Sequence, residues 1–279
     1  MLLEWIDAEA AVCAQAHTVR RIGIGNLLLA AACLTLVGPA HAQDPFEIHV
    51  YEYETLRRGD FTFETHLNYI GKGTKTFEGP VAPFQDQFHM TFELTAGLTD
   101  QVSVGFMQLN ARRPGDSLEY AGWRVLPHFY VPRSWHLPVD LGLVAEFSFQ
   151  KTTYEENSRR VEVRPIVEKS FGKLRADFNP VFERALHGPG TSGGWNFEPA
   201  ARIGYEVSER FSPSLEYYSE WGSLPSFLPI AGQLHQILPG GDLKLAKNVE
   251  WSFGVGIGTT PAGNRLVYKS RIEISFGIR

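Results

Sequence analysis

The last nine residues of the chain, RIEISFGIR (271–279), alternate between polar and apolar side chains. Successive side chains of a β-strand point to opposite sides, so this pattern predicts a strand with one apolar face. Four residues share that face: Ile272, Ile274, Phe276 and Ile278. Chain ends usually fray unless a sheet or another element holds them. The segment therefore predicts a strand that is paired with a neighbour and covered on its apolar face.

The same period of two runs through the chain from residue 61 onwards, in stretches of about ten residues separated by turn residues. In FTFETHLNY (61–69), for example, the aromatic and aliphatic side chains share one face and the polar side chains share the other. Twelve strands are predicted in this way, over residues 61–69, 87–98, 101–106, 121–131, 139–150, 160–169, 174–184, 196–206, 211–221, 233–245, 250–258 and 266–278. The tenth contains Pro239-Gly240-Gly241, which favours a bulge or a bend.

The connections between these strands alternate between short turns and mostly longer loops. Short turns are predicted at Thr99-Asp100, Gly172-Lys173, Ser208-Glu209 and Lys247-Asn248, with a slightly longer one over 132–138. The loops of the other set cover residues 71–86, 111–117, 151–158, 187–194 and 222–232, with a short one over 260–264. Transmembrane barrels show this asymmetry, with short turns on the periplasmic side. An even number of strands also brings both ends of the barrel sequence to that same side.

Alternation alone also fits a soluble β-sandwich, in which the charged faces would point outwards. Strand length separates the two, because spanning strands need about 9–11 tilted residues and globular strands average about 5–6. Aromatic residues gather towards the strand ends, as in the interfacial girdles of barrels. Closure removes unpaired edges and is obligatory in lipid. We therefore predict an all-β fold, a transmembrane up-and-down antiparallel β-barrel of about 12 strands, closed by pairing of 266–278 with 61–69.

The front of the chain predicts export. Arg20-Arg21 precedes the apolar run IGIGNLLLAAACLTLVG (22–38), and Ala40-His41-Ala42 then fits the small-x-small pattern of a signal-peptide cleavage site. The run is short for a membrane-spanning helix, which is the competing interpretation. We predict cleavage after Ala42. The predicted organisation is an N-terminal extension with signal peptide over 1–42, a periplasmic or lumen-tucked segment over 43–58, and an outer-membrane β-barrel over 59–279.

Composition excludes several classes of function. The net charge of −5 and the pI of about 6.0 lack the basic character of nucleic-acid binding. Both cysteines, Cys13 and Cys33, fall before the predicted cleavage site, so the mature chain has neither a disulfide nor a thiolate metal site. A mean hydropathy of −0.16 is compatible with a barrel, because only every second residue of a strand meets lipid.

Three stretches carry a resemblance to a known group of proteins: DPFEIHVYE (44–52), HLNY (66–69) and HMTFELTAGLTDQVSVGF (89–106). Together with the predicted signal and strands, they resemble Gram-negative outer-membrane β-barrel proteins. More narrowly, they are similar to a poorly characterised family of barrel transporters that includes meta-pathway phenol-degradation outer-membrane proteins. The resemblance implies export through the periplasm to the cell outer membrane, contact with outer-membrane lipid and insertion by the barrel assembly machinery. One departure is the end of the chain, where Arg279 replaces the usual final aromatic residue.

If the apolar faces meet lipid, the opposite faces line the lumen. The predicted pore-lining residues are Glu64, His66, His89, Glu93, Arg124, His128, Glu146, Glu162, Arg164, Glu168, Arg175, Asp177, Glu183, Glu198, Arg202, Glu216, Glu220, Lys269, Arg271 and Glu273. Acids outnumber bases in this set. Such a lumen is either a wet interior whose charges neutralise one another or a pathway whose charged rings set ion preference. We expect the first for most of the individual residues and a pore for the interior as a whole.

Neither catalysis nor metal binding is predicted. The sequence lacks G-x-S-x-G and the His-x-Ser-Asn-Gly segment of barrel phospholipases, and Ser219-Glu220 and His235 near a predicted loop carry no recognisable pattern. His66, His89 and Glu93 could approach one another on adjacent strands. Lone histidines on a polar face are more often solvated, however, so we predict no metal site and no cofactor.

Two functions remain open from the sequence. The first is a porin-like outer-membrane channel for passive passage of small solutes, with or without selectivity among them. The alternative is a non-conducting barrel that acts as an anchor, an adhesin or a lipid-modifying enzyme, with its lumen blocked by salt bridges and the segment 43–58. The transported solute and the oligomeric state are not determined by this sequence.

Overall fold

The computed structural model describes residues 44–224 and 226–277. Its strands are β1 (Phe61–Lys72), β2 (Phe88–Gly97), β3 (Val102–Arg112), β4 (Glu119–Tyr130), β5 (Asp140–Gln150), β6 (Arg159–Phe171), β7 (Leu174–Asn179), β8 (Phe182–His187), β9 (Asn196–Phe197), β10 (Ala200–Tyr205), β11 (Phe211–Glu220), β12 (Gly222–Ser223), β13 (Leu234–Ala246), β14 (Val249–Gly258) and β15 (Leu266–Phe276). Three short 3₁₀ helices lie in the connections: η1 (Arg133–Trp135), η2 (Pro189–Ser192) and η3 (Ile230–Gly232). Within these ranges no helix combines the length and the apolar character needed to cross a membrane. The predicted signal peptide and its cleavage site lie outside the described residues.

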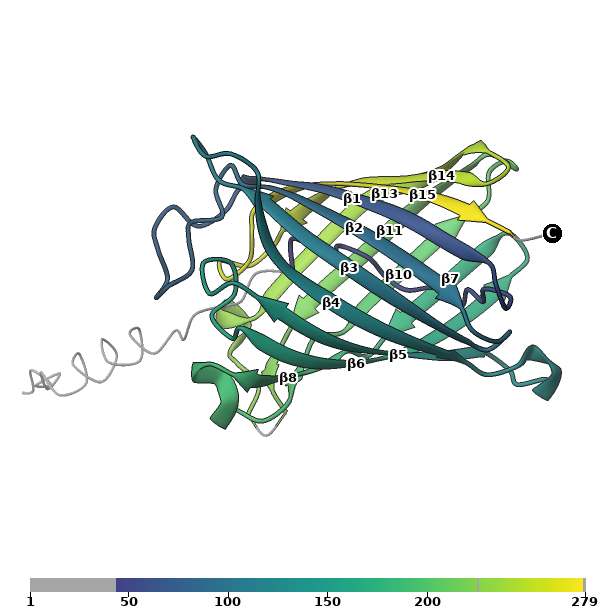
Figure 1. Ribbon diagram of the computed structural model, residues 1–279, viewed down its shortest axis with the longest axis horizontal. Coiled ribbons are helices and arrows are strands. Elements are labelled where there is room, and N and C mark those ends of the chain that lie inside the picture. Colours follow the sequence, from purple (N-terminus) through teal and green to yellow (C-terminus); the bar gives the residue numbers. More distant parts are fainter. Residues whose placement is uncertain (1–43, 225, 278–279) are drawn as a thin grey trace, which may run out of the picture. The chain divides into compact units, whose positions relative to one another are not determined.

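The strands close into an antiparallel barrel (Figure 1). Neighbouring strands follow the order β6-β5-β4-β3-β2-β1-β15-β14-β13-β11-β10-β7, and pairing of β7 with β6 completes the ring. The closing pair is β1 with β15, in which Phe61 lies opposite Phe276 and Tyr69 lies opposite Tyr268. The prediction of a closed barrel of twelve strands is confirmed within the described residues. The alternating segment near the end of the chain stays ordered because it pairs with β1 on one side and with β14 on the other.

Fifteen strand elements make twelve wall strands because three wall strands are interrupted. β8 continues β7 beyond Pro180, β10 continues β9 beyond Pro199, and β12 continues β11 beyond Trp221. Two of these three interruptions contain a proline, which has no N–H to donate to a neighbouring strand and so weakens the ladder there. β6 bridges the first interruption, since it pairs with β7 near the end of β6 and with β8 near its beginning.

The wall is inverted relative to a soluble protein. Leu94, Phe106, Leu215 and Ile257 are each 50% exposed on the outside. Charged residues of the same strands are buried on the inside, and Glu93 on β2 is only 2% exposed. A soluble sandwich would bury the first set and expose the second, so this arrangement excludes it.

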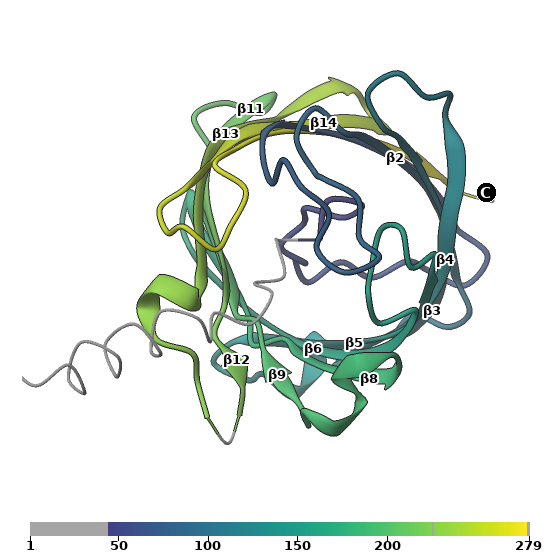
Figure 2. The same cartoon turned by 90° about the vertical axis from the view of Figure 1, so that its left-hand side faces the viewer.

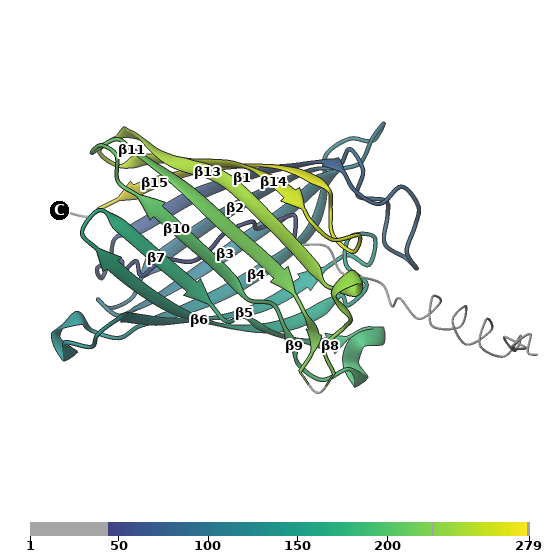
Figure 3. The same cartoon turned by 180° about the vertical axis from the view of Figure 1, so that it is seen from behind.

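The two ends of the barrel differ in their connections (Figures 1 and 3). At one end, here called the turn end, lie the connections β2–β3, β4–β5, β6–β7, β10–β11 and β13–β14. At the loop end lie the connections β1–β2, β3–β4, β5–β6, β8–β9, β12–β13 and β14–β15. The predicted alternation of short turns and longer loops is confirmed. β1 begins and β15 finishes at the turn end, as an even number of strands requires.

The prediction of a bulge or a bend at Pro239-Gly240-Gly241 is wrong for the bulge, and the bend stays a prediction. β13 keeps one register with β14 through this stretch, and its register shift lies between Lys244 and Ala246. The glycines instead permit a close approach of the two strands, because a Cβ atom on Gly240 would lie 2.0 Å from the carbonyl oxygen of Phe253.

Candidate functional site

Residues 44–54, here called the lumen segment, lie inside the ring of strands (Figure 2). Side chains of the wall satisfy the backbone groups of this segment. The Asn68 amide donates to the Pro45 carbonyl at 2.9 Å, and the Thr91 hydroxyl donates to the Phe46 carbonyl at 2.9 Å. The Tyr53 N–H donates to Glu168 Oε2 at 2.8 Å. Extended backbone can occupy the lumen because polar side chains replace the hydrogen bonds of a neighbouring strand.

The lumen segment also buries apolar side chains against the wall. Phe46 and Tyr51 belong to one buried cluster, whose other members are Met107, Leu109, Ala111, Ala121, Leu126, Tyr130, Val144, Tyr154 and Ile166. Ile48 and Val50 belong to a second cluster, with Ile70, Phe84, Ala200, Tyr218, Leu238 and Val267. Part of the lumen is therefore packed like the core of a soluble domain.

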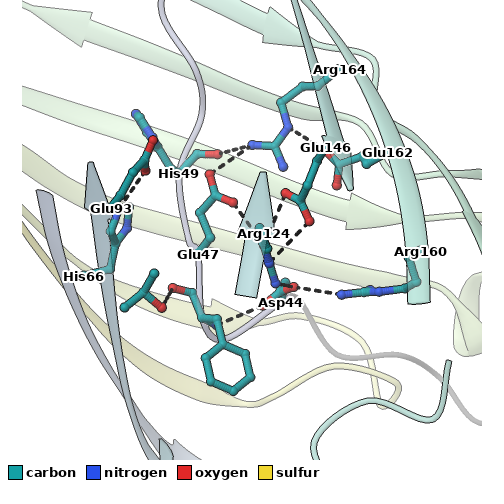
Figure 4. Close-up of polar contacts among 12 residues, drawn as sticks. Asp44, Glu47, His49, His66, Glu93, Arg124, Glu146, Arg160, Glu162 and Arg164 are labelled. Carbon is teal, nitrogen blue, oxygen red and sulfur yellow. Dashed lines mark hydrogen bonds and ion pairs between the residues drawn. The ribbon is translucent and has the colours of Figure 1, made fainter. Parts of the chain in front are cut away.

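An arginine-centred ionic network holds the beginning of the lumen segment (Figure 4). The Arg124 guanidinium pairs with Asp44, with Glu47 at 3.1 Å and with Glu146 at 3.3 Å. Arg160 pairs with Asp44 at 3.2 Å. Arg124 is 2% exposed, so these pairs form with little solvent screening. Asp44 therefore links two arginines of the wall.

A second network holds the segment nearer the turn end. Glu52 pairs with Arg175 and, at 2.6 Å, with Arg202. Arg202 also pairs with Asp242 and lies 3.6 Å from Asp177. The lumen segment is thus anchored at two places along its length, through β4 and β6 at Asp44 and through β7 and β10 at Glu52.

The charge of these arginines lowers the pKa of Asp44, which lies outside the spanning strands. Burial by itself would raise this pKa, but Arg124 and Arg160 outweigh that effect, with help from the Phe46 N–H, and bring the pKa of Asp44 to about 2. Asp44 is consequently ionised at any pH near neutrality.

Acidic residues face one another directly across several wall strands. Four glutamates form one row over β2, β1, β15 and β14: Glu93, Glu64, Glu273 and Glu250. A second row runs over β5, β6 and β8: Glu146, Glu162 and Glu183. Like charges directly opposite are unfavourable, so these rows require cations between them. Arg271 serves the first row, where it lies 3.1 Å from Glu64 and 3.8 Å from Glu273.

All of the predicted pore-lining residues lie on strands or breaks of the wall, and none is exposed. Glu162, Arg175, Glu198 and Glu220 are half-buried, and the remainder are buried. The strand register and the ion pairs bring together acids and arginines from neighbouring strands. His89 is a different case, because its ring packs edge-on against Phe46 of the lumen segment at 4.6 Å.

Several residues of the site were missed by the sequence reasoning. Asp44, Glu47 and Glu52 belong to the segment 43–58, and no charged contacts were predicted for these residues from the sequence. Arg160 was also omitted, although it shares the face of Glu162 on β6 and could have been found by extending that face by one step. The apolar residues of the lumen were missed too, because their faces on β3 and β4 carry few charges.

Cavities remain on both sides of the packed region. A cavity of about 450 Å³ near the turn end is bordered by Glu52, Arg175 and Arg202, among others. A cavity of about 90 Å³ towards the loop end is bordered by Asp44, Arg160 and Glu198. The lumen segment borders both cavities.

Ser219 and His235 do not form a catalytic pair. They lie opposite each other in the register of β11 and β13. The Ser219 hydroxyl donates to the Pro199 carbonyl at 3.0 Å, while the His235 ring nitrogens contact Tyr217 at 2.6 Å and Gln233 at 2.9 Å. Both side chains are thus engaged by other partners, and the expectation that the protein is not an enzyme stays a prediction.

No protein-family model and no curated protein matches the chain. Among solved structures, it is similar to the NanC porin, with 8% sequence identity over 78% of this chain and 100% of that chain and a TM-score of 0.53. It also resembles the KdgM porin, at 12% identity over 77% of this chain and 99% of that chain with a TM-score of 0.49. The Acinetobacter baumannii outer membrane protein Omp33 aligns at 8% identity over 78% and 98% of the two chains, with a TM-score of 0.46. The likeness to the NanC porin shows that the chain shares the β-barrel fold of that protein.

Proposed function

We propose that this protein is a porin-like channel of the Gram-negative outer membrane, through which small solutes pass passively along a charged lumen. The observation that carries the proposal is the inversion of the wall, with apolar side chains outside and charged side chains inside a closed ring. Lipid requires an apolar band on the outside of a barrel, and an aqueous path requires a polar interior.

We further propose that residues 43–58 act as a plug. The lumen segment is anchored at Asp44 and Glu52 and packed in two apolar clusters, which supports a closed lumen in this conformation. Release of the segment would leave a ring of twelve strands, which is wider than the side-chain-filled eight-stranded type. Asp44 and Glu52 are held by side-chain ion pairs with wall arginines, so release of the plug leaves the backbone pairing of the wall intact.

Planar-bilayer conductance tests both parts of the proposal. The refolded wild type and a variant lacking residues 43–58 are compared, after heat-modifiable gel migration has established that each barrel is folded. We expect the deletion variant to give discrete conductance steps and the wild type to be closed or to conduct much less. Equal conductance in both proteins would contradict the plug and leave the channel intact. Absence of conductance in both folded barrels would overturn the channel.

A second candidate is the non-conducting barrel, which acts as an anchor, an adhesin or a lipid-modifying enzyme. The dense ion pairing of the lumen favours it, because Arg124, Arg160 and Arg202 each contact at least two acids. If residues 43–58 complete the block, the wild type is closed and the deletion variant conducts. If the ion pairs within the wall block the lumen by themselves, the deletion variant stays closed as well. Incubation of the folded protein with phospholipid or lipopolysaccharide, followed by analysis for products, tests its enzymatic form.

We also propose insertion by the barrel assembly machinery, which reads the final strand. Depletion of this machinery is expected to lower the yield of heat-modifiable barrel in outer membranes, and an unchanged yield would contradict the proposal.

A further inference from the structure

Three buried side chains on β1 and β2 converge on one point of the lumen wall. Glu64 and His66 are two residues apart on β1 and so share its inner face, and Glu93 on β2 lies directly opposite Glu64. Glu64 is 9% exposed, His66 is 1% exposed and Glu93 is 2% exposed. One potential ligand atom from each residue lies within 4.8 Å of the other two. The trio therefore offers one imidazole nitrogen and two carboxylates in a single buried place.

The distances in the trio are too long for hydrogen bonds. His66 Nε2 lies 3.4 Å from Glu64 Oε2 and 3.6 Å from Glu93 Oε2. Charge-assisted N–H···O bonds are about 2.7–2.9 Å long. Among the described residues, neither His66 Nε2 nor Glu93 Oε2 has a hydrogen-bond partner. Buried polar atoms are nearly always paired, so two orphaned atoms directed at one place point to a ligand there.

The same spacing fits ligands around a small divalent cation. Zn²⁺ binds imidazole nitrogen and carboxylate oxygen at about 2.0–2.2 Å, so neighbouring ligand atoms of a tetrahedral ion are about 3.3–3.6 Å apart. The two distances from His66 Nε2 agree with this range. A modest movement of the glutamate side chains would complete the geometry.

The charges around the trio also leave a place for a cation. Arg271 is shared by Glu64 and Glu273, at 3.1 and 3.8 Å. Within the described part of the chain, no lysine or arginine forms an ion pair with Glu93, whose Oε1 accepts a hydrogen bond from the Thr95 hydroxyl at 2.8 Å. The acid row thus has its arginine on one side of Glu64 and lacks a strong cation on the other side.

A cavity borders the two glutamates of the trio. It has a volume of about 40 Å³ and is bordered by Glu64, Glu93 and Thr95, with Tyr51 of the lumen segment among its other walls. One water molecule takes about 30 Å³ in the liquid, so a metal-bound water fits this space. Catalytic and exchangeable zinc sites have this composition of three protein ligands and one open position.

We propose that Glu64, His66 and Glu93 bind one divalent transition-metal cation of the Zn²⁺ type, with its fourth position open to the lumen. The site does not include His89, the histidine that sequence reasoning grouped with His66 and Glu93, because that ring packs against Phe46. The ion lies against the lumen segment, whose His49 ring centroid is 6.3 Å from that of His66. The proposal does not rest on solute conduction, because it concerns the wall of the folded barrel.

Zinc binding by the refolded full barrel tests the proposal. Chelator-stripped protein is titrated with Zn²⁺, and the bound metal is measured by calorimetry and by elemental analysis after desalting. We expect one equivalent in the wild type and at least a tenfold weaker affinity in His66→Gln and in Glu93→Gln. The matched control is His89→Gln, which replaces a buried histidine on the same face of β2 and is expected to bind like the wild type.

A spectroscopic readout separates a built site from scattered carboxylates. Co²⁺ in place of Zn²⁺ is expected to give the intense visible absorption of a four-coordinate ion in the wild type and in His89→Gln, and to lose it in His66→Gln. Failure of the folded wild type to bind Zn²⁺ would overturn the proposal. Equal binding by all four folded proteins would overturn it too, because the metal would then lie on other acids of the lumen. A protonated His66 bridging the two glutamates would be seen as an imidazolium signal by NMR that added Zn²⁺ leaves unchanged, and this result would also overturn it.

Discussion

Asn179 on β7 and Tyr51 in the lumen segment exchange two hydrogen bonds. The Tyr51 N–H donates to Asn179 Oδ1 at 2.7 Å, and Asn179 Nδ2 donates to the Tyr51 carbonyl at 3.0 Å. A side-chain amide thereby offers the plug the same donor and acceptor that a neighbouring strand would offer. Asn179 is fully buried and stands immediately before Pro180, where the ladder of the wall is interrupted.

Substitution of Asn179 by Ala is expected to loosen the plug. It leaves the buried N–H and carbonyl of Tyr51 without partners, at a cost of about 1–3 kcal/mol for each group left unpaired. The released population should rise at least about fivefold. A cysteine at Val50, which is fully buried, reports release through labelling by a membrane-impermeant maleimide, since the chain has no cysteine after Cys33.

The control for this substitution is Asn110→Ala on β3, because Asn110 donates to the Met90 carbonyl of the wall. It should leave the labelling rate at Val50→Cys unchanged. Equal labelling in the Asn179 and Asn110 variants would show that the amide exchange does not hold the plug.

Arg124→Met is expected to destabilise the folded barrel and its plug together. It leaves Asp44, Glu47 and Glu146 close to one another without their shared cation. Removal of one partner from a buried ion pair typically costs about 3–5 kcal/mol. Arg133→Met is the matched control, because that side chain is 63% exposed and its pair with Asp140 should contribute less than about 1 kcal/mol. Urea unfolding in lipid vesicles measures the free energy of unfolding of both variants. Similar losses of this free energy in Arg124→Met and Arg133→Met would contradict the ionic anchor.

The contribution of Asp44 to plug docking should depend on acid pH. The pKa of the Asp44 carboxyl is about 2 in the docked plug, against an ordinary value of 3.8. The ionised carboxylate therefore favours docking. This stabilisation is fully present above about pH 4 and is lost as the pH falls towards 2. Wild type and Asp44→Asn, both carrying Val50→Cys, are exposed to each pH and then labelled in a neutral pulse. The difference in labelling between them should be constant from pH 5 to 8. It should shrink below pH 4, and a difference at pH 2 as large as that at pH 5 would contradict the assignment.

A charge placed on the outer face should report the lipid band. Leu215 lies near the middle of β11 and is 50% exposed on the outside. Leu215→Arg is expected to destabilise the folded barrel in bilayers, lowering its free energy of unfolding by about 2–4 kcal/mol. Phe77→Arg serves as the control, since Phe77 is 63% exposed in the connection between β1 and β2 at the loop end. If both variants fold equally well, the outer face of β11 does not meet hydrocarbon.

The unplugged barrel is expected to prefer cations. The row of Glu146, Glu162 and Glu183 remains in the wall when residues 43–58 are deleted, while Asp44 and Glu47 leave with the plug. Reversal potentials in a KCl gradient should therefore show K⁺ passing severalfold more readily than Cl⁻. Glu162→Gln should reduce this preference, whereas Asp116→Asn, in the connection between β3 and β4, should not. Anion preference in the deletion variant would contradict the acid rows as the source of selectivity.

The sequence by itself determined the wall of this protein. A period of two over twelve stretches leaves one apolar and one charged face on each strand, and the even count with alternating connections leaves a closed ring as the arrangement without exposed edges. The pairing of β15 with β1 follows from that closure. These features are local, because each strand carries its own pattern.

Only the tertiary structure decided what occupies the lumen. The path of residues 44–54, the rows that place Glu93, Glu64 and Glu273 opposite one another, and the exclusion of His89 from the trio depend on how far neighbouring strands are staggered. The alternating pattern predicts which face of a strand a side chain occupies. It carries no information about the height of that side chain in the barrel or about its partner across the lumen. Ion pairs such as Asp44 with Arg124 join residues far apart in the sequence, and their formation depends on the three-dimensional arrangement of the whole ring.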